Sequence, residues 1–325
     1  MRRGLMDDRA YGCFTSIMNW VDRVAVSLLA YCAVLALIAT GLVAAPAARA
    51  RSLDGSVASV AGSTPSADSS FPPVPPTGRL AEPLTYVAMG DSFTSTGSIV
   101  GMDPMTFGSF GGDTCFRSAD NYPSRIREAT NWTVTDVSCR GLKVPLTYTS
   151  RAEYGPPQIN ALHPGVDLVS LQVGGNDTDV LRLAELCVLS ADCSHLEGEW
   201  AAKVPKVAPG LRQLLRDIRA RAPRARIMLV GYLQPFHLVP CVDIAPYSAA
   251  NQNFGRRHID RLNAMLRDVA RAEGVEIVAD RTPPGHSACD PDRWTSFLGV
   301  DAGAVPLHPT HAGHLATARM ILDRV

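Results

Sequence analysis

Residues 84–94 read LTYVAMGDSFT, a short apolar run followed by a glycine and several small polar side chains. The apolar half, 84–89, is rich in residues that favour strands and ends at Gly90, so it predicts a buried β-strand. Ser92 follows this strand almost directly. In α/β proteins reactive side chains lie just beyond the carboxyl ends of parallel strands, so Ser92 marks the start of a candidate site.

The same alternation continues along the chain. Segments with apolar residues at helical spacing separate further short apolar runs, and this alternation indicates a three-layer α/β/α sandwich around a mostly parallel central sheet. The predicted strands are 84–89, 131–137, 167–173, 226–231 and 275–278, and the predicted helices are 122–129, 179–189, 204–222, 248–273 and 310–323.

The charge balance excludes one class of partner. The chain has 325 residues with 31 basic and 31 acidic side chains, a formal net charge of zero. Binding to nucleic acid depends on a surplus of Lys and Arg that neutralises phosphates, so we expect no nucleic-acid partner. The charged fraction of 19%, together with 26 glycines and 24 prolines, also excludes a long coiled coil.

The first 50 residues have the pattern of an export signal. Arginines at positions 2, 3, 9 and 23 precede an uncharged apolar stretch of 22 residues, 24–45, and the small residues of Ala48-Arg49-Ala50 follow it. This predicts a signal peptide, 1–50, cleaved after Ala50. The stretch is also long enough to span a bilayer, so an uncleaved signal anchor that holds the protein at the membrane is the alternative. Either way we expect a secreted or cell-envelope-associated protein.

Residues 51–83 form a Ser- and Pro-rich segment with little apolar bulk. Such a composition does not repay the entropy of ordering, so the segment is expected to be a flexible linker. The folded domain is then 84–325, which is long enough to bury a large core as one unit. We expect this domain to be a monomer.

Three polar segments lie where the predicted sheet would place reactive groups. Gly90-Asp91-Ser92 follows the first strand, Gly174-Gly175-Asn176-Asp177 follows the third, and His308-Pro309-Thr310 precedes the last helix. A serine hydroxyl becomes a nucleophile only beside a base, usually histidine, and with donors for the developing oxyanion. Each segment alone is typical of a turn or a helix cap, but their order and placement together predict a serine hydrolase.

These segments resemble the four blocks of the SGNH (GDSL-type) hydrolase superfamily, which here are Gly90-Asp91-Ser92, Gly141, Gly175-Asn176-Asp177 and His308. The resemblance covers 84–325 and is greatest to secreted actinobacterial esterases and lipases. It implies a flavodoxin-like α/β/α fold and an exported serine esterase or lipase that hydrolyses carboxylic esters through an acyl-enzyme. No metal or organic cofactor is implied.

The resemblance also implies roles for individual residues. Ser92 would be the nucleophile and His308 the base of a Ser-His dyad. The backbone amides of Ser92 and Gly141, with the side-chain amide of Asn176, would form the oxyanion hole. Many family members place an aspartate three residues before the histidine, but Val305 stands there in this chain. We therefore expect the main-chain carbonyl of Val305 to orient His308, with Asp301 as the fallback.

Six of the eight cysteines lie in the predicted domain, and an even number in an exported domain predicts disulfides. Six cysteines allow fifteen connectivities, among which the spacing alone does not choose. The family resemblance implies pairs that are neighbours in the chain: Cys115–Cys139, Cys187–Cys193 and Cys241–Cys289.

Several alternatives remain open at this point. Gly285-His286-Ser287 could begin the serine elbow of an α/β-hydrolase, but Cys289 replaces the final glycine of that motif. His308, His311 and His314 have a metal-like spacing without an accompanying cysteine or carboxylate cluster, so we expect no metal. Asp177 and Asp179 are expected to cap a helix.

The substrate is expected to be a lipid or another acylated small molecule, with acetylated polysaccharide as the alternative. A hypothesis of another class is an exported, non-enzymatic binding module that keeps the fold but has lost part of a block.

Overall fold

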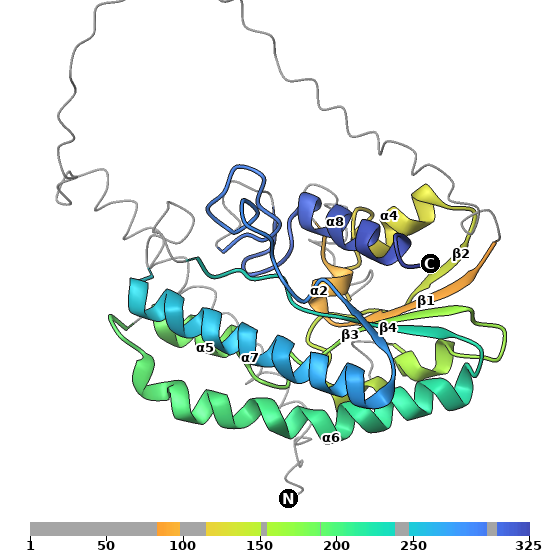
Figure 1. Ribbon diagram of the computed structural model, residues 1–325, viewed down its shortest axis with the longest axis horizontal. Helices are drawn as coiled ribbons and strands as arrows, with labels where there is room; N and C mark the ends of the chain where they lie inside the picture. The colour runs from red at the N-terminus through yellow and green to blue at the C-terminus, as the bar shows by residue number, and fades with distance from the viewer. Residues whose placement is uncertain (1–82, 98–114, 151–154, 189, 238–246, 298–303) are drawn as a thin grey trace, which may run out of the picture. The chain divides into compact units, whose positions relative to one another are not determined.

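A five-stranded sheet forms the centre of the domain (Figure 1). All neighbouring strands are parallel, and their order is β2-β1-β3-β4-β5. The strands are β1 (Thr85–Gly90), β2 (Thr133–Asp136), β3 (Leu168–Gln172), β4 (Arg226–Val230) and β5 (Glu276–Val278). Each lies within one or two residues of a predicted strand.

The computed structural model describes residues 83–97, 115–150, 155–188, 190–237, 247–297 and 304–325. The predicted signal segment and nearly all of the predicted linker lie outside these ranges, as do Asp301 and Cys241. Among the helices of the described ranges, none is both long enough and apolar enough to cross a bilayer.

Helices cover both faces of the sheet, so the predicted three-layer sandwich is confirmed. Helices α4 (Tyr122–Ala129) and α8 (His311–Leu322) lie on one face, and α5 (Val180–Val188), α6 (Glu197–Arg221) and α7 (Ala249–Glu273) lie on the other (Figure 1). Shorter elements connect them: α2 (Ser92–Ser95) and the 3₁₀ turns η2 (Val144–Tyr148), η3 (Gln158–Ala161) and η4 (Ser194–Leu196).

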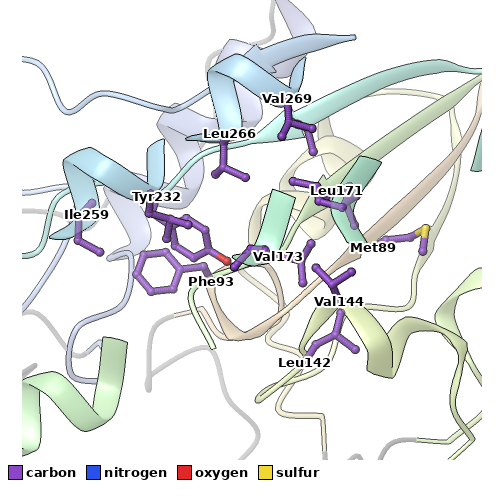
Figure 2. Packing of buried hydrophobic residues seen from close by; sticks show 14 of the residues in the cluster. Met89, Phe93, Leu142, Val144, Leu171, Val173, Tyr232, Ile259, Leu266 and Val269 are labelled. Carbon is purple, nitrogen blue, oxygen red and sulfur yellow. The ribbon is translucent and has the colours of Figure 1, made fainter. Parts of the chain in front are cut away.

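Strand β1 shows how the two core layers arise. Successive side chains of a strand point to opposite faces, so a strand buried on both sides is apolar throughout. Val87 and Met89 belong to the cluster beneath α6 and α7, whereas Tyr86 and Ala88 belong to the cluster beneath α4 and α8. Figure 2 shows part of the first cluster, where Met89 lies near Leu171 of the neighbouring strand β3.

Helix α6 departs from the prediction. It begins at Glu197, seven residues before the expected start at position 204, and it contains Pro205 and Pro209. Proline inside a helix removes a backbone hydrogen bond, and the earlier start places Pro205 deeper inside the helix than the predicted bounds did. Both prolines are on the exposed side of the helix, where water can satisfy the carbonyls that they leave unpaired.

The carboxyl ends of the central strands meet at one edge of the sheet. Gly90 of β1 pairs with Gln172 of β3, and Leu171 of β3 pairs with Leu229 of β4. The chain leaves each of these strands at the same edge, so segments far apart in the sequence come together there. This edge carries the candidate site.

Candidate active site

The segment that carries Ser92 is fixed from its first residue. After β1 ends at Gly90, the Asp91 carboxylate caps α2 by accepting the backbone N–H of Phe93 at 2.9 Å. The backbone N–H of Asp91 donates to the carbonyl of Gln172 at 2.9 Å, which ties the turn to β3. Ser92 is therefore the first residue of a short helix, and its half-buried side chain lines a pocket.

A buried polar network holds this segment to its neighbours. The Thr94 hydroxyl donates to Gln172 Oε1 at 3.0 Å, and Gln172 Nε2 donates to the carbonyl of Gly231 at 2.6 Å. The Gln158 side-chain amide bonds both the N–H and the carbonyl of Gly90, at 2.9 and 3.0 Å. Buried polar groups that are fully bonded make a rigid arrangement, so the turn after β1 has little freedom.

His308 lies beside the serine. Its Nε2 is 2.7 Å from Ser92 Oγ, and its Nδ1 is 2.7 Å from the main-chain carbonyl of Pro306. A carbonyl can only accept a hydrogen bond, so Nδ1 carries the proton and the lone pair of Nε2 faces the serine hydroxyl. This tautomer is the one that a general base beside serine requires.

The carbonyl that orients His308 differs from the prediction. The Val305 carbonyl accepts the backbone N–H of His308 at 3.1 Å in a four-residue turn, and the imidazole Nδ1 bonds the Pro306 carbonyl instead. Pro306 and Leu307 are the central residues of this turn, and Leu307 has a φ of 65°. A proline followed by a residue with positive φ is the pattern of a type II turn. It leaves the Pro306 carbonyl facing the imidazole, so the assignment to Val305 was wrong. The fallback, Asp301, lies outside the described residues.

The imidazole lies in an apolar environment. The ring centroid of Phe93 is 4.9 Å from that of His308, and only 9% of the His308 surface is exposed. Burial lowers the pKa of His308 to about 4, because desolvation disfavours the charged ring, and the hydrogen bond to Pro306 opposes this shift only in part. The imidazole is therefore neutral at neutral pH and can accept a proton.

The three expected oxyanion donors lie at the same edge. The Ser92 and Gly141 amides donate to no group in the part of the chain that the structure describes. Gly141 has a φ of 71°, a conformation that side chains other than glycine rarely adopt. Asn176 Nδ2 is 3.1 Å from the Leu142 carbonyl and 3.4 Å from Asp91 Oδ2. The second contact is long, so one amide hydrogen is only weakly engaged.

The two aspartates after Asn176 do not cap a helix as expected. The Asp177 carboxylate accepts the backbone N–H of Val144 at 3.0 and 3.1 Å. Asp179 forms ion pairs of 3.1 Å with Lys143 and with Lys203. Both therefore connect the segment of Asn176 to the segment that follows Gly141, and so they fix the two expected oxyanion donors relative to each other.

Comparisons with known proteins agree with this geometry. The model of the GDSL-like lipase/acylhydrolase family matches residues 88–316. The chain belongs to this family. Lipase 2 of Streptomyces coelicolor is 32% identical to this chain over 259 residues. The match covers 74% of this chain and 85% of Lipase 2. As a member of the family, the protein is a carboxylic ester hydrolase.

Two solved structures share the fold of this lipase/acylhydrolase. Phospholipase A1 from Streptomyces albidoflavus NA297 has a TM-score of 0.60 at 24% identity, covering 75% of this chain and 99% of that one. The extracellular lipase from Streptomyces rimosus has a TM-score of 0.61 at 23% identity, covering 74% and 99%. The predicted family and fold are thus confirmed.

An apolar pocket opens beside the serine of this lipase/acylhydrolase. Ser92, Asn176 and His308 line it together with the apolar side chains of Phe93, Val180, Leu181, Pro235, Ile259 and Leu307. Figure 2 shows Phe93, Tyr232 and Ile259 gathered on this side of the core. The pocket wall also includes the carboxyl group of Asp91 and the imidazole of His308, and both side chains are buried. The wall suits an uncharged, apolar acyl group.

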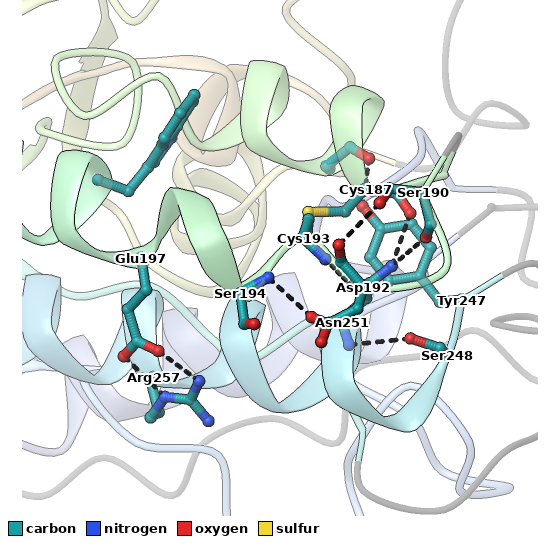
Figure 3. Close-up of a disulfide and its surroundings, with 12 residues drawn as sticks. Cys187, Ser190, Asp192, Cys193, Ser194, Glu197, Tyr247, Ser248, Asn251 and Arg257 are labelled. Carbon is teal, nitrogen blue, oxygen red and sulfur yellow. Dashed lines mark hydrogen bonds and ion pairs between the residues drawn. A yellow bond between two sulfur atoms is a disulfide. The ribbon is translucent and has the colours of Figure 1, made fainter.

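Helix α5, which supplies Val180 and Leu181, is held in place at its far end (Figure 3). Asn251 of α7 accepts the backbone N–H of Cys193 at 2.8 Å and donates to the carbonyls of Cys187 and Ser190 at 2.8 and 2.6 Å. The Cys187–Cys193 disulfide closes the same loop. This bonding fixes the pocket wall against α7.

Two of the three expected disulfides are present, Cys115–Cys139 and Cys187–Cys193. Cys289 is also disulfide-bonded. Its expected partner, Cys241, lies outside the described residues, so that pair stays a prediction.

The other histidines and serines that the sequence singled out have different partners. His314 is buried, with Nδ1 accepting from the Tyr122 backbone and Nε2 bonded to the Thr96 carbonyl. His311 lies 3.4 Å from Asp120. Within the described ranges, no group of three or more His, Cys, Asp or Glu side chains could hold a metal ion. Ser287 donates to Asp290, which gives no support to the alternative elbow.

Sequence reasoning assigned no role to Tyr232, Gln158 or Gln172. Tyr232 follows β4 at the same edge as Ser92, and its hydroxyl lies 2.5 Å from Asp91 Oδ2. The rule that placed Ser92 and Asn176 beyond strand ends would also have placed Tyr232 there. The two glutamines carried no comparable signal, because their bonds join positions more than 55 residues apart.

Proposed function

We propose that this ester hydrolase is an exported serine lipase or esterase that cleaves lipid or related acyl esters through an acyl-enzyme. Ser92 is the nucleophile and His308 the general base. The observation that carries the proposal is the 2.7 Å contact between Ser92 Oγ and a neutral imidazole whose other nitrogen is held by Pro306. This contact lies at an apolar pocket.

In the first half of the reaction, His308 Nε2 takes the proton of Ser92 as the hydroxyl oxygen attacks the ester carbonyl. The carbonyl oxygen becomes negative and accepts hydrogen bonds from the amides of Ser92 and Gly141 and from Asn176 Nδ2. The tetrahedral intermediate then collapses. The bond to the alcohol breaks, and the alcohol leaves with the proton that His308 returns.

In the second half, a water molecule replaces the alcohol. His308 removes a proton from this water, which attacks the carbonyl of the acyl-Ser92 ester, and the same donors hold the second oxyanion. When the intermediate collapses, His308 returns the proton to Ser92 Oγ, and the carboxylic acid is released. Atoms and protons balance over the cycle without a cofactor.

The pocket supports a lipid-like substrate. Its wall is mostly aliphatic and aromatic, and one of its residues, Leu181, is 49% exposed although it is large and apolar. An apolar side chain that borders both the pocket and the solvent suits an acyl chain entering from a lipid phase. The similarity to Lipase 2 of Streptomyces coelicolor, over 74% of this chain, also supports a lipid-like substrate.

Export is supported by two features. The Arg-rich, apolar N-terminal segment has the order of a secretory signal or signal anchor. The described domain also contains two disulfides, which persist in oxidising compartments and are rare in the cytosol. We propose that the mature domain is released or held at the cell envelope, depending on whether the signal is cleaved.

The test compares Ser92→Ala with Ser150→Ala, a control at an exposed serine. Ser92→Ala should lower kcat/KM by at least about a thousandfold, because the nucleophile is lost, while the far-UV circular dichroism stays unchanged. Ser150→Ala should match the unsubstituted enzyme. Wild-type turnover in Ser92→Ala would refute the assignment of the site.

Substrate class is tested with p-nitrophenyl esters from acetate to palmitate, phosphatidylcholine and acetylated xylan. The proposal expects higher kcat/KM on medium or long acyl chains than on acetate, since a longer chain buries more of its surface in the pocket. Activity confined to acetylated xylan would instead identify a carbohydrate esterase. Failure of every ester, with intact fold, would favour the non-enzymatic module.

A further inference from the structure

The donors of the oxyanion hole come from separate parts of the chain. The Ser92 amide follows β1 and the Asn176 side chain follows β3, 84 positions later. Both must point at one oxygen atom, and oxyanion stabilisation depends on donors that already lie at 2.7–3.1 Å from the place where the charge develops. Something must therefore fix Asn176 relative to Ser92.

A ring of hydrogen bonds joins these two segments. Asp91, the neighbour of Ser92, accepts from Asn176 Nδ2 at 3.4 Å and from the Tyr232 hydroxyl at 2.5 Å, both at Oδ2. The Tyr232 oxygen in turn accepts the backbone N–H of Gly175 at 2.9 Å. Asp91 thus contacts the Asn176 side chain directly and the adjoining Gly175 backbone through the phenol.

Tyr232 is itself held rigidly. Its backbone N–H donates to Asn263 Oδ1 at 2.9 Å, and its carbonyl accepts from Asn263 Nδ2 at 2.8 Å. Its ring meets Phe93 edge-on with centroids 4.9 Å apart, and only 1% of its surface is exposed. A Cβ at Gly175 would lie 2.9 Å from the Tyr232 ring, so glycine permits this close approach.

We propose that Tyr232 is a positioning residue for ester hydrolysis: its hydroxyl, through Asp91 and Gly175, holds the Asn176 amide in the orientation that serves the oxyanion together with Ser92. The inference rests on the proposed function of Ser92 and Asn176. Tyr232 does not touch the reacting atoms and acts only through its neighbours.

The burial of Asp91 explains why a phenol is needed. A buried carboxyl group costs free energy unless its oxygens are hydrogen-bonded, so Asp91 requires donors from the protein. Asp91 is 1% exposed and receives hydrogen bonds from Tyr232, from the Phe93 amide and, at longer distance, from Asn176. Because Tyr232 and Phe93 already bond the carboxyl group, its contact with Asn176 can stay long, which leaves that amide hydrogen available to the oxyanion in the orientation that Asn176 already has.

The test removes the hydroxyl with Tyr232→Phe and uses Tyr86→Phe as a matched control. Tyr86 is also fully buried, and its hydroxyl bonds Ser170 at 2.7 Å, on the strand rather than at the pocket. Tyr232→Phe removes the bonds of a buried phenol to Asp91 and from Gly175, and Tyr86→Phe removes the bond of a buried phenol to Ser170, so both variants should melt at a lower temperature. Only Tyr232→Phe should lower kcat, by roughly 10- to 100-fold, with KM changed by less than about twofold.

Two further measurements separate positioning from loss of stability. The affinity for a trifluoromethyl ketone, which forms a tetrahedral adduct with the serine, should fall in Tyr232→Phe by about the same factor as kcat. In an Asn176→Ala background, Tyr232→Phe should have little additional effect, because the residue through which it acts is gone. If Tyr232→Phe does not fold, Asp91→Asn replaces it in the same double-mutant cycle with Asn176→Ala.

An unchanged kcat in Tyr232→Phe, or effects of Tyr232→Phe and Asn176→Ala that simply multiply, would overturn the inference. Failure of the proposed function has a different signature, which is full activity in Ser92→Ala. The outcomes are therefore distinguishable: an inactive Ser92→Ala enzyme with a normal Tyr232→Phe enzyme removes only the role of Tyr232.

Discussion

The two halves of the candidate dyad are held in different ways. Residues 90–97, the nucleophile segment, follow the central strand β1 and are fixed by buried side-chain bonds to Gln158, Gln172 and Tyr232. Residues 304–310, the base segment, belong to no long element before α8. Main-chain bonds hold them instead, from Ser296 N–H to the His308 carbonyl at 3.1 Å and from Leu307 N–H to the Phe297 carbonyl at 3.0 Å.

This difference determines which substitutions each segment tolerates. Side-chain bonds depend on residue identity, so the nucleophile segment should be sensitive to single substitutions. Main-chain bonds and the antiparallel bridge between Thr295 and Pro309 survive most side-chain changes. The base segment also stores strain, since Leu307 adopts a left-handed conformation that is unfavourable for a residue with a Cβ. The nucleophile is positioned by side-chain hydrogen bonds, and the base by main-chain hydrogen bonds.

The largest expected effect on stability tests the bracing of the nucleophile segment. Cys139 N–H donates to the Gly90 carbonyl and the Cys115 carbonyl accepts from Ser95, so this disulfide joins both ends of the segment. Replacing both cysteines with alanine should lower the free energy of unfolding by about 3 kcal/mol, from the loop entropy of the unfolded chain. Denaturant unfolding measures the change.

The matched control is the double alanine variant of Cys187 and Cys193. Those residues are separated by 6 positions, against 24 for Cys115 and Cys139, so the shorter loop predicts a loss of about 2 kcal/mol. Residual activity should fall further in the Cys115/Cys139 variant, because its loop contacts Ser95. If both variants lost the same stability and the same activity, the Cys115–Cys139 disulfide would have no particular role in holding the nucleophile segment.

The next effect concerns the base and pH. Burial lowers the pKa of His308 to about 4, so the imidazole stays neutral in the folded protein down to that pH. We expect kcat/KM to fall about tenfold per pH unit only below about pH 4. The unfolded chain binds that proton near pH 6.5, so folding stability decreases as pH falls from about 6.5 toward 4. Circular dichroism at each pH separates the two effects.

Asp91 is a second group that can titrate within the pH profile of kcat/KM. Burial raises its pKa to about 7, against the opposing hydrogen bonds from Tyr232 and Phe93. The profile should therefore be recorded in Asp91→Asn as well, which removes any step near neutrality that belongs to the carboxyl. A fall near pH 6.5 that persists in this variant would contradict a buried, neutral His308.

The smallest effect is expected in the base segment. Pro306→Ala keeps the carbonyl that faces His308 and changes only the stiffness of the turn, so stability should fall by about 0.4–1 kcal/mol and kcat by less than about threefold. Pro205→Ala in α6 is the opposite control: it restores a helical N–H and should not lower stability. A kcat loss above tenfold in Pro306→Ala would mean that the turn is as sensitive as the nucleophile segment.

Much of the fold was predictable because its signals are local. Strands β1, β2 and β3 end in a glycine or a polar residue, and Gly231 follows β4. The side chains of Asn121 and Ser248 cap the N-termini of α4 and α7. The early start of α6 was not predictable, because the exposure of Pro205 and Pro209 depends on how the helix lies on the sheet. Of the candidate site, Ser92, Gly141, Asn176 and His308 were recognisable from the sequence, because they lie in the four blocks of the family.

The sequence by itself determined which residues could do the chemistry and at which end of the sheet they lie, because strand periodicity and strand ends are local properties of the chain. Only the tertiary structure decided what orients them. The choice of the Pro306 carbonyl over that of Val305 depends on the direction of one peptide in a turn. The partnership of Asp91 with Tyr232 joins the ends of two strands that are not neighbours in the sheet, 141 positions apart, and no local pattern records such a contact.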